Sequence, residues 1–349
     1  MERSIENNYD IFKLLHPEDN DVLCNMTNSD RINIMFVLKQ YCLELRRTLN
    51  LSSDITFGTE IESENSDREA IVSDIRKVFP YNTWIIKNDE SLYHGTEVNS
   101  PVLRDTEKTW IDLDTVCNIV GTHAEVLEKT SAHVHIGMHI LGNNPKYWRN
   151  FVKLWMTYEN IITRFLFGEY NAPREKLTYY AEPISQYLIE DLDRIEDRAK
   201  GSNAFNMIKL LNKQDVKRRS VNFRHVGKTS LYDYDKEANK NTIEFRGGNG
   251  TFNVIIWQNY INLLTKLLMY AKRDDFNDEI INQRLSIVIK NKIPSNLYKY
   301  SQINIAQAFE FADLIFTNNL DKIYFLRQYF KDMSVSMEAL TLSQNFCRR

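Results

Sequence analysis

The chain has 349 residues, of which 43% are hydrophobic, 26% charged and 12% aromatic, a composition typical of a folded protein with a substantial core. This composition excludes a disordered or fibrous protein, and the formal charge of −3 provides no general attraction for nucleic acid. The 11 glycines and 7 prolines are fewer than a many-turned β-barrel or β-sandwich needs, which favours long helices.

Residues 1–50 are expected to be a helical lead-in, because their apolar residues recur at close to helical spacing. Short alternating segments then predict strands, with a helical pattern between some of them. The expected strands are 56–62, 83–87, 97–103 and 132–140, and the expected helices are 68–79 and 112–129.

The second half of the chain is expected to be mainly helical. The periodicity predicts a helix over 146–168, short helices over 169–215, strands at 220–226 and 242–245, and an amphipathic helix over 255–272. Helices are then expected to about residue 340. Central strands with helices at both ends predict an α+β fold rather than a regular βαβ alternation.

The start of the chain and its cysteines bear on the compartment. The first residues lack the basic and apolar regions of a secretory signal, and no run of about 18 apolar residues predicts a membrane span. The four cysteines form no CxxC pair and are far apart, which favours reduced thiols, with Cys117 in the core. We therefore expect a cytoplasmic protein that has no membrane or nucleic-acid partner.

Three polar pairs at strand spacing are the informative feature of the sequence. Each places two functional side chains at positions i and i+2 around an apolar residue: Glu60-Ile61-Glu62, His133-Val134-His135 and Glu244-Phe245-Arg246. In a strand these side chains point to one face, roughly 6.5–7 Å apart, while the apolar residue points to the other. Glu97 adds a carboxylate on another expected strand, with Asp89 and Glu90 just upstream.

The residue types favour a metal–nucleotide site. A single alternating strand usually has only a solvated polar face, but glutamate is disfavoured in strands. Two carboxylates about 7 Å apart repel by roughly 2–2.5 kcal/mol at an effective dielectric constant of 20, a cost that cations between them would remove. Carboxylates with an imidazole suit Mg²⁺ or Mn²⁺, and an adjacent arginine suits phosphate.

Other interpretations of the same residues stay open. The spacing of His133, His135 and His139 also fits a cupin-like metal site or a metal-dependent hydrolase barrel, although neither fold suits the remaining pattern. The glycine-rich residues 247–251 are expected to turn the chain into a helix, and either to approach a phosphate there or only to turn the chain. The basic cluster at 217–228 is expected on a solvated surface, or to reach a phosphate through one or two arginines.

Four segments resemble the amidoligase family, carboxylate–amine ligases similar to glutamine synthetase and glutamate–cysteine ligase. They are FGTEIE (57–62), NDESLYHGTEVNSPVL (88–103), SAHVHIG (131–137) and NTIEFRGGNGT (241–251), in the family's order. The resemblance implies a curved antiparallel sheet with helices packed behind it. It also implies a glutamine synthetase-like catalytic domain at 51–275, after the lead-in at 1–50 and before a helical extension at 276–349 packed on the same domain.

The resemblance implies ATP and two Mg²⁺ (or Mn²⁺) ions on the open face of the sheet. By position, the implied metal ligands are Glu60, Glu62, Glu97, His133 and Glu244. His133 and Glu244 would together ligate the second metal. The residue before His133 is alanine where the family has a glycine, a small departure from its pattern.

The same resemblance implies roles for residues near the phosphates. Arg246 would hold the transferred phosphoryl group, and His135 would contact the phosphate or the substrate. Asp89 would belong to the nucleotide site, although its turn differs from the Asp-Gly-Ser-like turn of the family. Arg219 is a further candidate for a phosphate, and Glu90 is a candidate to take a proton from the amine.

The implied reaction has two steps. A carboxylate attacks the γ-phosphate of ATP to give an acyl phosphate and ADP, and an amine then displaces phosphate to form an amide. The carboxylate and amine can belong to a small molecule, a peptide or a protein, and the sequence does not fix these substrates or the oligomeric state. The alternatives are a phosphotransferase resembling guanidino kinases and a non-catalytic binding protein of this fold.

Overall fold

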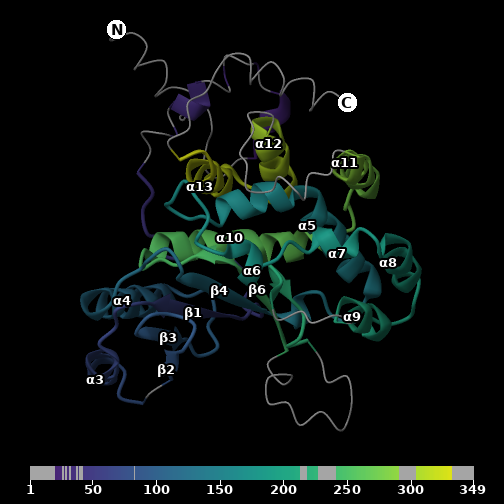
Figure 1. The fold of residues 1–349 in the computed structure, drawn as a ribbon. Helices are drawn as coiled ribbons and strands as arrows, with labels where there is room; N and C mark the ends of the chain where they lie inside the picture. The colour runs from purple at the N-terminus through teal and green to yellow at the C-terminus, as the bar shows by residue number, and fades with distance from the viewer. Residues whose placement is uncertain are drawn as a thin grey trace, which may run out of the picture.

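The computed structural model describes residues 42–81, 83–212, 218–226, 241–290 and 304–331, together with 20–25, 27, 30, 33–36 and 38. Within these ranges the chain forms layers (Figure 1). Helices α5 (Pro145–Phe165) and α10 (Val254–Ala271) lie behind the sheet, and α12 (Asn304–Ile315) and α13 (Asn319–Phe330) pack on them. The predicted α+β fold with an open, curved antiparallel sheet is confirmed.

The sheet described here has six antiparallel strands in the order β2-β3-β1-β4-β6-β5. Their bounds are β1 (Phe57–Ser63), β2 (Ile85–Asp89), β3 (Gly95–Asn99), β4 (Ser131–Gly137), β5 (Val221–Asn222) and β6 (Thr242–Asn249). The strands predicted at 132–140 and 220–226 are therefore shorter than expected. In β4 the reason is local, because the chain turns into the 3-10 helix η2 (Met138–Ile140) directly after Gly137.

The three polar pairs lie on one face of the sheet, as their spacing predicts. The residues between them, Ile61, Val134 and Phe245, are each 1% exposed and belong to the core behind the sheet. The cross-strand register places Glu60 opposite His133. It likewise places His135 opposite Glu244, so that the functional side chains of three neighbouring strands share one surface.

The glycine-rich segment is not the turn that we expected. Strand β6 continues through Gly247 and Gly248 and ends at Asn249. A Cβ atom on Gly248 would lie 2.7 Å from the carbonyl oxygen of Ala132, where the pairing of β4 with β6 shifts register. The glycines thus allow the two strands to approach closely at a bulge, and the chain enters α10 only after Asn253 caps it.

The remaining described helices follow the predicted order, but the expected helical lead-in over 1–50 is wrong for residues 42–50, which form no helix. The remaining helices are η1 (Leu23–Asn25), α3 (Arg68–Val78), α4 (Glu107–His123), α6 (Leu177–Tyr180), α7 (Ser185–Leu188), α8 (Leu192–Ala199), α9 (Phe205–Leu211) and α11 (Asp278–Lys290). Helix α4 begins five residues earlier than predicted, because the Thr106 side chain caps it by accepting a hydrogen bond from the backbone N–H of Thr109. Cys117 in α4 is fully buried, as expected. The predicted helix beyond residue 331 and Cys347 lie outside the described residues.

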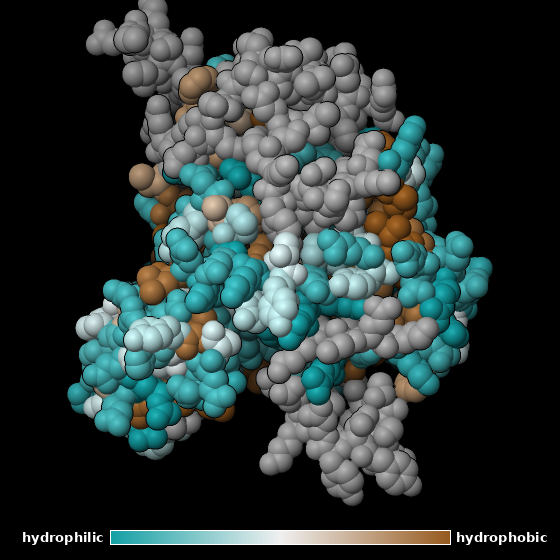
Figure 2. All heavy atoms as spheres, viewed as in Figure 1, coloured by the Kyte–Doolittle hydropathy of each residue, from teal (hydrophilic) through white to brown (hydrophobic). Residues whose placement is uncertain are grey.

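Helix α10 differs from the amphipathic helix that its spacing indicates. Nearly all of its residues are buried, because α10 lies between strand β4 of the sheet and the helices α5, α12 and α13, and it also contacts α4. The surface of the described chain is mainly hydrophilic in the view of Figure 2, with hydrophobic residues in small scattered groups. No helix in the described ranges has both the length and the apolar character needed to cross a bilayer.

Helices α5, α8 and α11 are joined by a buried lysine. The Lys153 ammonium lies 2.7 Å from Glu196 and 2.8 Å from Asp278, and its side chain is 2% exposed. Partial burial alone would raise the pKa values of these two carboxyls, but hydrogen bonds from Lys153 hold both below their usual values. The ionised carboxylates therefore stabilise the native state above the ordinary pKa values of 4.5 and 3.8, and this contribution is lost as pH falls below those values and through the lower native pKa values.

We expect Lys153→Met to lower the free energy of unfolding at pH 7 by about 1 kcal/mol, because both carboxylates are partly exposed and screened by water. The difference from the wild type should shrink below about pH 4, where the carboxylates become protonated. Urea denaturation at pH 7, 5 and 3.5 measures it. Lys108→Met, which removes an exposed pair with Asp112, serves as the control. A difference that stays constant over this pH range would contradict the prediction.

Candidate active site

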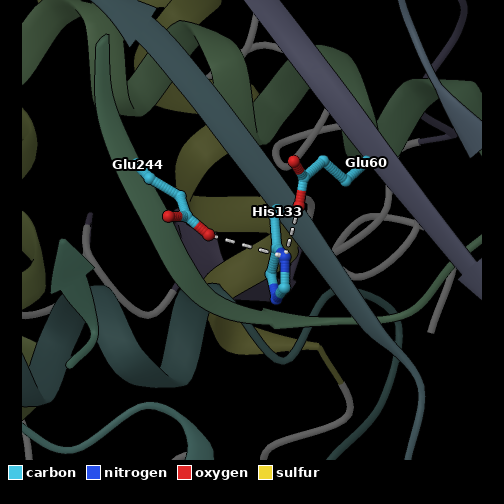
Figure 3. A group of neighbouring side chains, drawn as sticks. All are labelled: Glu60, His133 and Glu244. Carbon is cyan, nitrogen blue, oxygen red and sulfur yellow. Dashed lines mark hydrogen bonds and ion pairs between the residues drawn. The ribbon is translucent and has the colours of Figure 1, made fainter. Parts of the chain in front are cut away.

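One group of possible metal ligands lies at the centre of the sheet and consists of Glu60, His133 and Glu244, the central cluster (Figure 3). The three come from the adjacent strands β1, β4 and β6, and their ligand atoms lie within 4.8 Å of one another. His133 Nδ1 is 2.9 Å from Glu60 Oε2 and 3.8 Å from Glu244 Oε1. All three side chains are buried, so the face that carries them is more enclosed than the sequence pattern suggests.

A second group, the outer cluster, consists of Glu62, Asp89 and Glu97. These residues come from β1, β2 and β3, whereas the central cluster comes from β1, β4 and β6. The two clusters therefore extend from β1 toward opposite edges of the sheet. The two clusters adjoin, because Glu62 Oε1 lies 3.6 Å from His133 Nε2. The Lys87 ammonium lies 2.7 Å from Glu97 and offsets part of the charge.

This grouping differs from the one that the resemblance implies. The resemblance puts Glu60 and Glu62 at one metal and Asp89 with the nucleotide, whereas here Glu60 joins His133 and Asp89 joins Glu62. The pairing of the strands is the reason, because Glu60 lies opposite His133 on β4, whereas Glu62 lies opposite Glu97 on β3. The assignment of these residues as metal ligands stays a prediction.

The carboxylates of the central cluster are held in the ionised form. Burial would raise the pKa of Glu60, but hydrogen bonds with His133 and His135 lower it well below its usual value. His135 Nε2 lies 3.0 Å from Glu60 Oε1. Burial would likewise raise the pKa of Glu244, but a hydrogen bond with His225 and the charge of Arg246 lower it far below the usual range. Two buried carboxylates thus carry negative charge at neutral pH.

Two residues that contact Glu244 were not predicted from the sequence to belong to the site. Asn222 Nδ2 donates to Glu244 Oε2 at 2.6 Å, and His225 Nε2 lies 3.0 Å from the same oxygen. Both come from β5 and the turn after it. We expected His225 on a solvated basic surface, which is wrong, because the pairing of β5 with β6 brings it against Glu244 and leaves it 5% exposed. Lys217 and Lys228 of that basic cluster lie outside the described residues.

Arg246 connects the central cluster to a polar pocket. Its Nη1 donates to Glu244 Oε1, and its side chain lines a pocket that also contains Glu62 and Ser131. Further residues lining it are Ser91, Leu92, Lys129, Arg174, Lys176 and Tyr180. A partly buried arginine beside carboxylates is the arrangement that the sequence predicts for binding a phosphoryl group.

Neither cluster includes the predicted residues Glu90 and Arg219, or His139 of the alternative three-histidine site. Glu90 is exposed on the turn after β2. The Arg219 guanidinium lies 4.5 Å from the ring of Tyr187, and its phosphate role stays a prediction. His139 is exposed and its Nε2 is 2.9 Å from the carbonyl oxygen of Asp54, so the described residues do not assemble a cupin-like set of three histidines.

The family described as "Putative amidoligase enzyme" matches residues 86–268, more than half of the chain. The protein therefore belongs to this family, which confirms the resemblance read from the sequence and supports, at a coarse level, an amide-forming ligase. The matched range contains His133, Glu244 and Arg246, and β1 precedes it. No curated protein matches the chain.

Proposed function

We propose that this protein is an ATP- and Mg²⁺-dependent carboxylate–amine ligase that forms an amide through an acyl phosphate. The family supports amide formation. The observation that carries the rest is the position of two adjoining carboxylate clusters beside a partly buried arginine on one sheet face. Phosphoryl transfer needs such a combination, because charge on the phosphate oxygens must be neutralised while the reacting groups are held in line.

The donor atoms fit hard divalent cations. The two clusters together offer five carboxylates and one imidazole, and oxygen-rich sets of this kind favour Mg²⁺ or Mn²⁺ over Zn²⁺. The central cluster and the outer cluster would each hold one ion. When bound, the ions would neutralise the phosphates of ATP and orient them.

Arg246 is the residue that we assign to the transferred phosphoryl group. Glu244 holds its Nη1, while its buried Nε has no hydrogen-bond partner among the described residues and is available to a ligand. A guanidinium presents a planar set of donors that matches phosphate oxygens. In the first step the substrate carboxylate forms a bond to the γ-phosphorus as the bond to ADP breaks.

The second step forms the amide. The amine nitrogen attacks the acyl carbon, the bond from that carbon to the phosphate oxygen breaks, and inorganic phosphate leaves with Arg246 beside it. The amine must also lose a proton. Glu90 stays our candidate for the base, on the exposed turn that joins β2 to β3 next to Asp89.

A larger pocket accommodates the nucleoside in this proposal. It lies at one end of the sheet face, where Gly58, His135 and Thr242 line it. Its volume is about 500 Å³. Its walls include the apolar residues Phe57, Ile85, Pro101 and Val102. Asn99, which lies opposite Glu60 in the sheet, has a buried Oδ1 with no partner among the described residues. An unsatisfied acceptor in a mostly apolar pocket suits a nucleoside.

The first experiment is a calorimetric titration of the protein with a non-hydrolysable ATP analogue, in Mg²⁺ and then in EDTA. We expect binding in Mg²⁺ only, and we expect Glu62→Gln to weaken it by about 100-fold, because the variant removes one charge from the outer cluster. Glu69→Gln, at an exposed position of α3 that belongs to neither cluster and lines neither pocket, should bind like the wild type. Unchanged binding by Glu62→Gln, or binding that persists in EDTA, would contradict the metal assignment. Release of free phosphate on turnover distinguishes a ligase from a phosphotransferase.

A further inference from the structure

The polar pocket beside Arg246, here called the cationic pocket, contains more positive charge than the proposed reaction explains. Four of the residues that line it are cationic: Lys129, Arg174, Lys176 and Arg246. The only acidic residue among those that line it is Glu62. Like charges brought together in this way repel one another, so the pocket has a strong preference for an anionic ligand.

Arg174 is built into the wall of this pocket. Its side chain is buried, with 7% of the residue exposed. Its Nη2 donates to the carbonyl oxygen of Arg246, and its guanidinium lies 5.9 Å from the ring of Tyr180. Its backbone N–H donates to the side chain of Asn249, on the same strand as Arg246. Both arginines are therefore positioned by β6, which fixes one relative to the other before any ligand binds.

The pocket is too small for a nucleoside. Its volume is about 80 Å³, against about 500 Å³ for the larger pocket. One water-sized group needs on the order of 10–15 Å³ of such space, so the cationic pocket holds a few non-hydrogen atoms, which matches a carboxylate or a phosphate. Two lysines at the rim, Lys129 and Lys176, are exposed and can adjust to such a group.

The two pockets lie at opposite ends of the same strands. Glu60 on β1 lines the larger pocket, whereas Glu62 lines the cationic pocket. On β6 the same division separates Thr242 from Arg246. A nucleotide whose nucleoside occupies the larger pocket would extend its phosphates across the central cluster toward Arg246. The cationic pocket then lies beyond the terminal phosphate, on the side from which an attacking carboxylate must approach.

We propose that the cationic pocket binds a second anionic group of the carboxylate substrate, so that the substrate is a dicarboxylate. One carboxylate accepts the phosphoryl group beside Arg246, and the other is held by Arg174 with Lys129 and Lys176. This inference rests on the proposed function for the role of the first carboxylate. A phosphate group of the nucleotide is also an oxyanion and would suit the same donors. Competition between glutarate and the nucleotide distinguishes a phosphate from a second carboxylate.

The test compares two acids of equal chain length, glutarate and pentanoate. Their dissociation constants are measured by calorimetry on the full chain, with and without Mg²⁺ and a non-hydrolysable ATP analogue. We expect glutarate to bind about 10–100-fold more tightly than pentanoate, since hydrogen bonds to a charged group contribute this much. Arg174→Gln should remove most of the preference and leave the affinity for the nucleotide within about threefold of the wild type.

Lys176→Gln provides a second variant at an exposed position that does not threaten the fold, and it should reduce the preference for glutarate about 3–10-fold. Arg218→Gln changes an exposed arginine stacked on Tyr179 and serves as the matched control. Equal affinity for the two acids, or a preference that both variants retain, overturns the inference. Competition between glutarate and the nucleotide, with nucleotide binding weakened by Arg174→Gln, assigns the pocket to a phosphate and also overturns it.

Failure of the proposed function would look different. In that case the wild type would not bind the nucleotide in Mg²⁺, whereas the titrations of glutarate and pentanoate without nucleotide would still decide whether the cationic pocket selects a dianion.

Discussion

Arg246→Lys is expected to reduce ATP turnover by about 10³-fold or more while changing the affinity for Mg²⁺·ATP by less than about tenfold. Lysine keeps the positive charge but replaces a planar, multiply donating group with a single ammonium. In the native protein Glu244 holds one arm of the guanidinium, and the buried Nε remains for the phosphoryl group. An ammonium cannot satisfy both at once, so the loss falls on the transition state, where phosphoryl charge is greatest.

The rate is measured as ADP formed with glutarate and hydroxylamine as stand-in substrates, and nucleotide affinity is measured by calorimetry. Arg218→Lys is the matched control, because Arg218 is exposed and stacks on Tyr179. If Arg246→Lys turned over ATP at the wild-type rate, the assignment of Arg246 to the phosphoryl group would be wrong. If the rate and the nucleotide affinity fell by the same factor, Arg246 would instead stabilise the bound nucleotide and the transition state equally.

The local pattern of the sequence was sufficient to locate the strands, although not their ends, and to assign the face that each polar pair occupies. A strand has a strict period of two, so Glu60 and Glu62 must share a face wherever β1 lies in the sheet. The same pattern does not predict which strands are neighbours in the sheet. The sequence does not contain the order β2-β3-β1-β4-β6-β5, and only that order brings Asp89 to Glu62 and His133 to Glu60.

Residues that reach the site from irregular segments could not be found by periodicity. Asn222 and His225 contact Glu244 only because the two-residue strand β5 pairs with β6 at that level. Arg174 lies in a loop before a one-turn helix, and its place beside Arg246 depends on a tertiary hydrogen bond to Asn249. A spacing of two or of three to four residues predicts neighbours within an element, but it contains no information about contacts of this kind.

Glu244 joins the two functional parts of the site, and we expect its replacement to have the largest effect. Its Oε1 accepts from Arg246, while its Oε2 is bound by Asn222 and His225. It also belongs to the central cluster. Glu244→Gln preserves the shape but removes the negative charge, so we expect Mg²⁺-dependent nucleotide affinity to fall by about 100-fold and ATP turnover by about 10³-fold or more.

A double-variant cycle tests whether these losses share one origin. If Glu244 acts on turnover by holding Arg246, then Glu244→Gln combined with Arg246→Lys should lose little more turnover than the worse single variant. Simple multiplication of the two losses would instead show that Glu244 and Arg246 act independently. Glu69→Gln, at an exposed position in the first turn of α3, is the matched control and should leave both nucleotide affinity and turnover unchanged. If the two losses in turnover simply multiply, Glu244 acts only at the metal site. If the double variant loses little more than the worse single variant, Glu244 is the residue that aligns the arginine with the metal-bound phosphates.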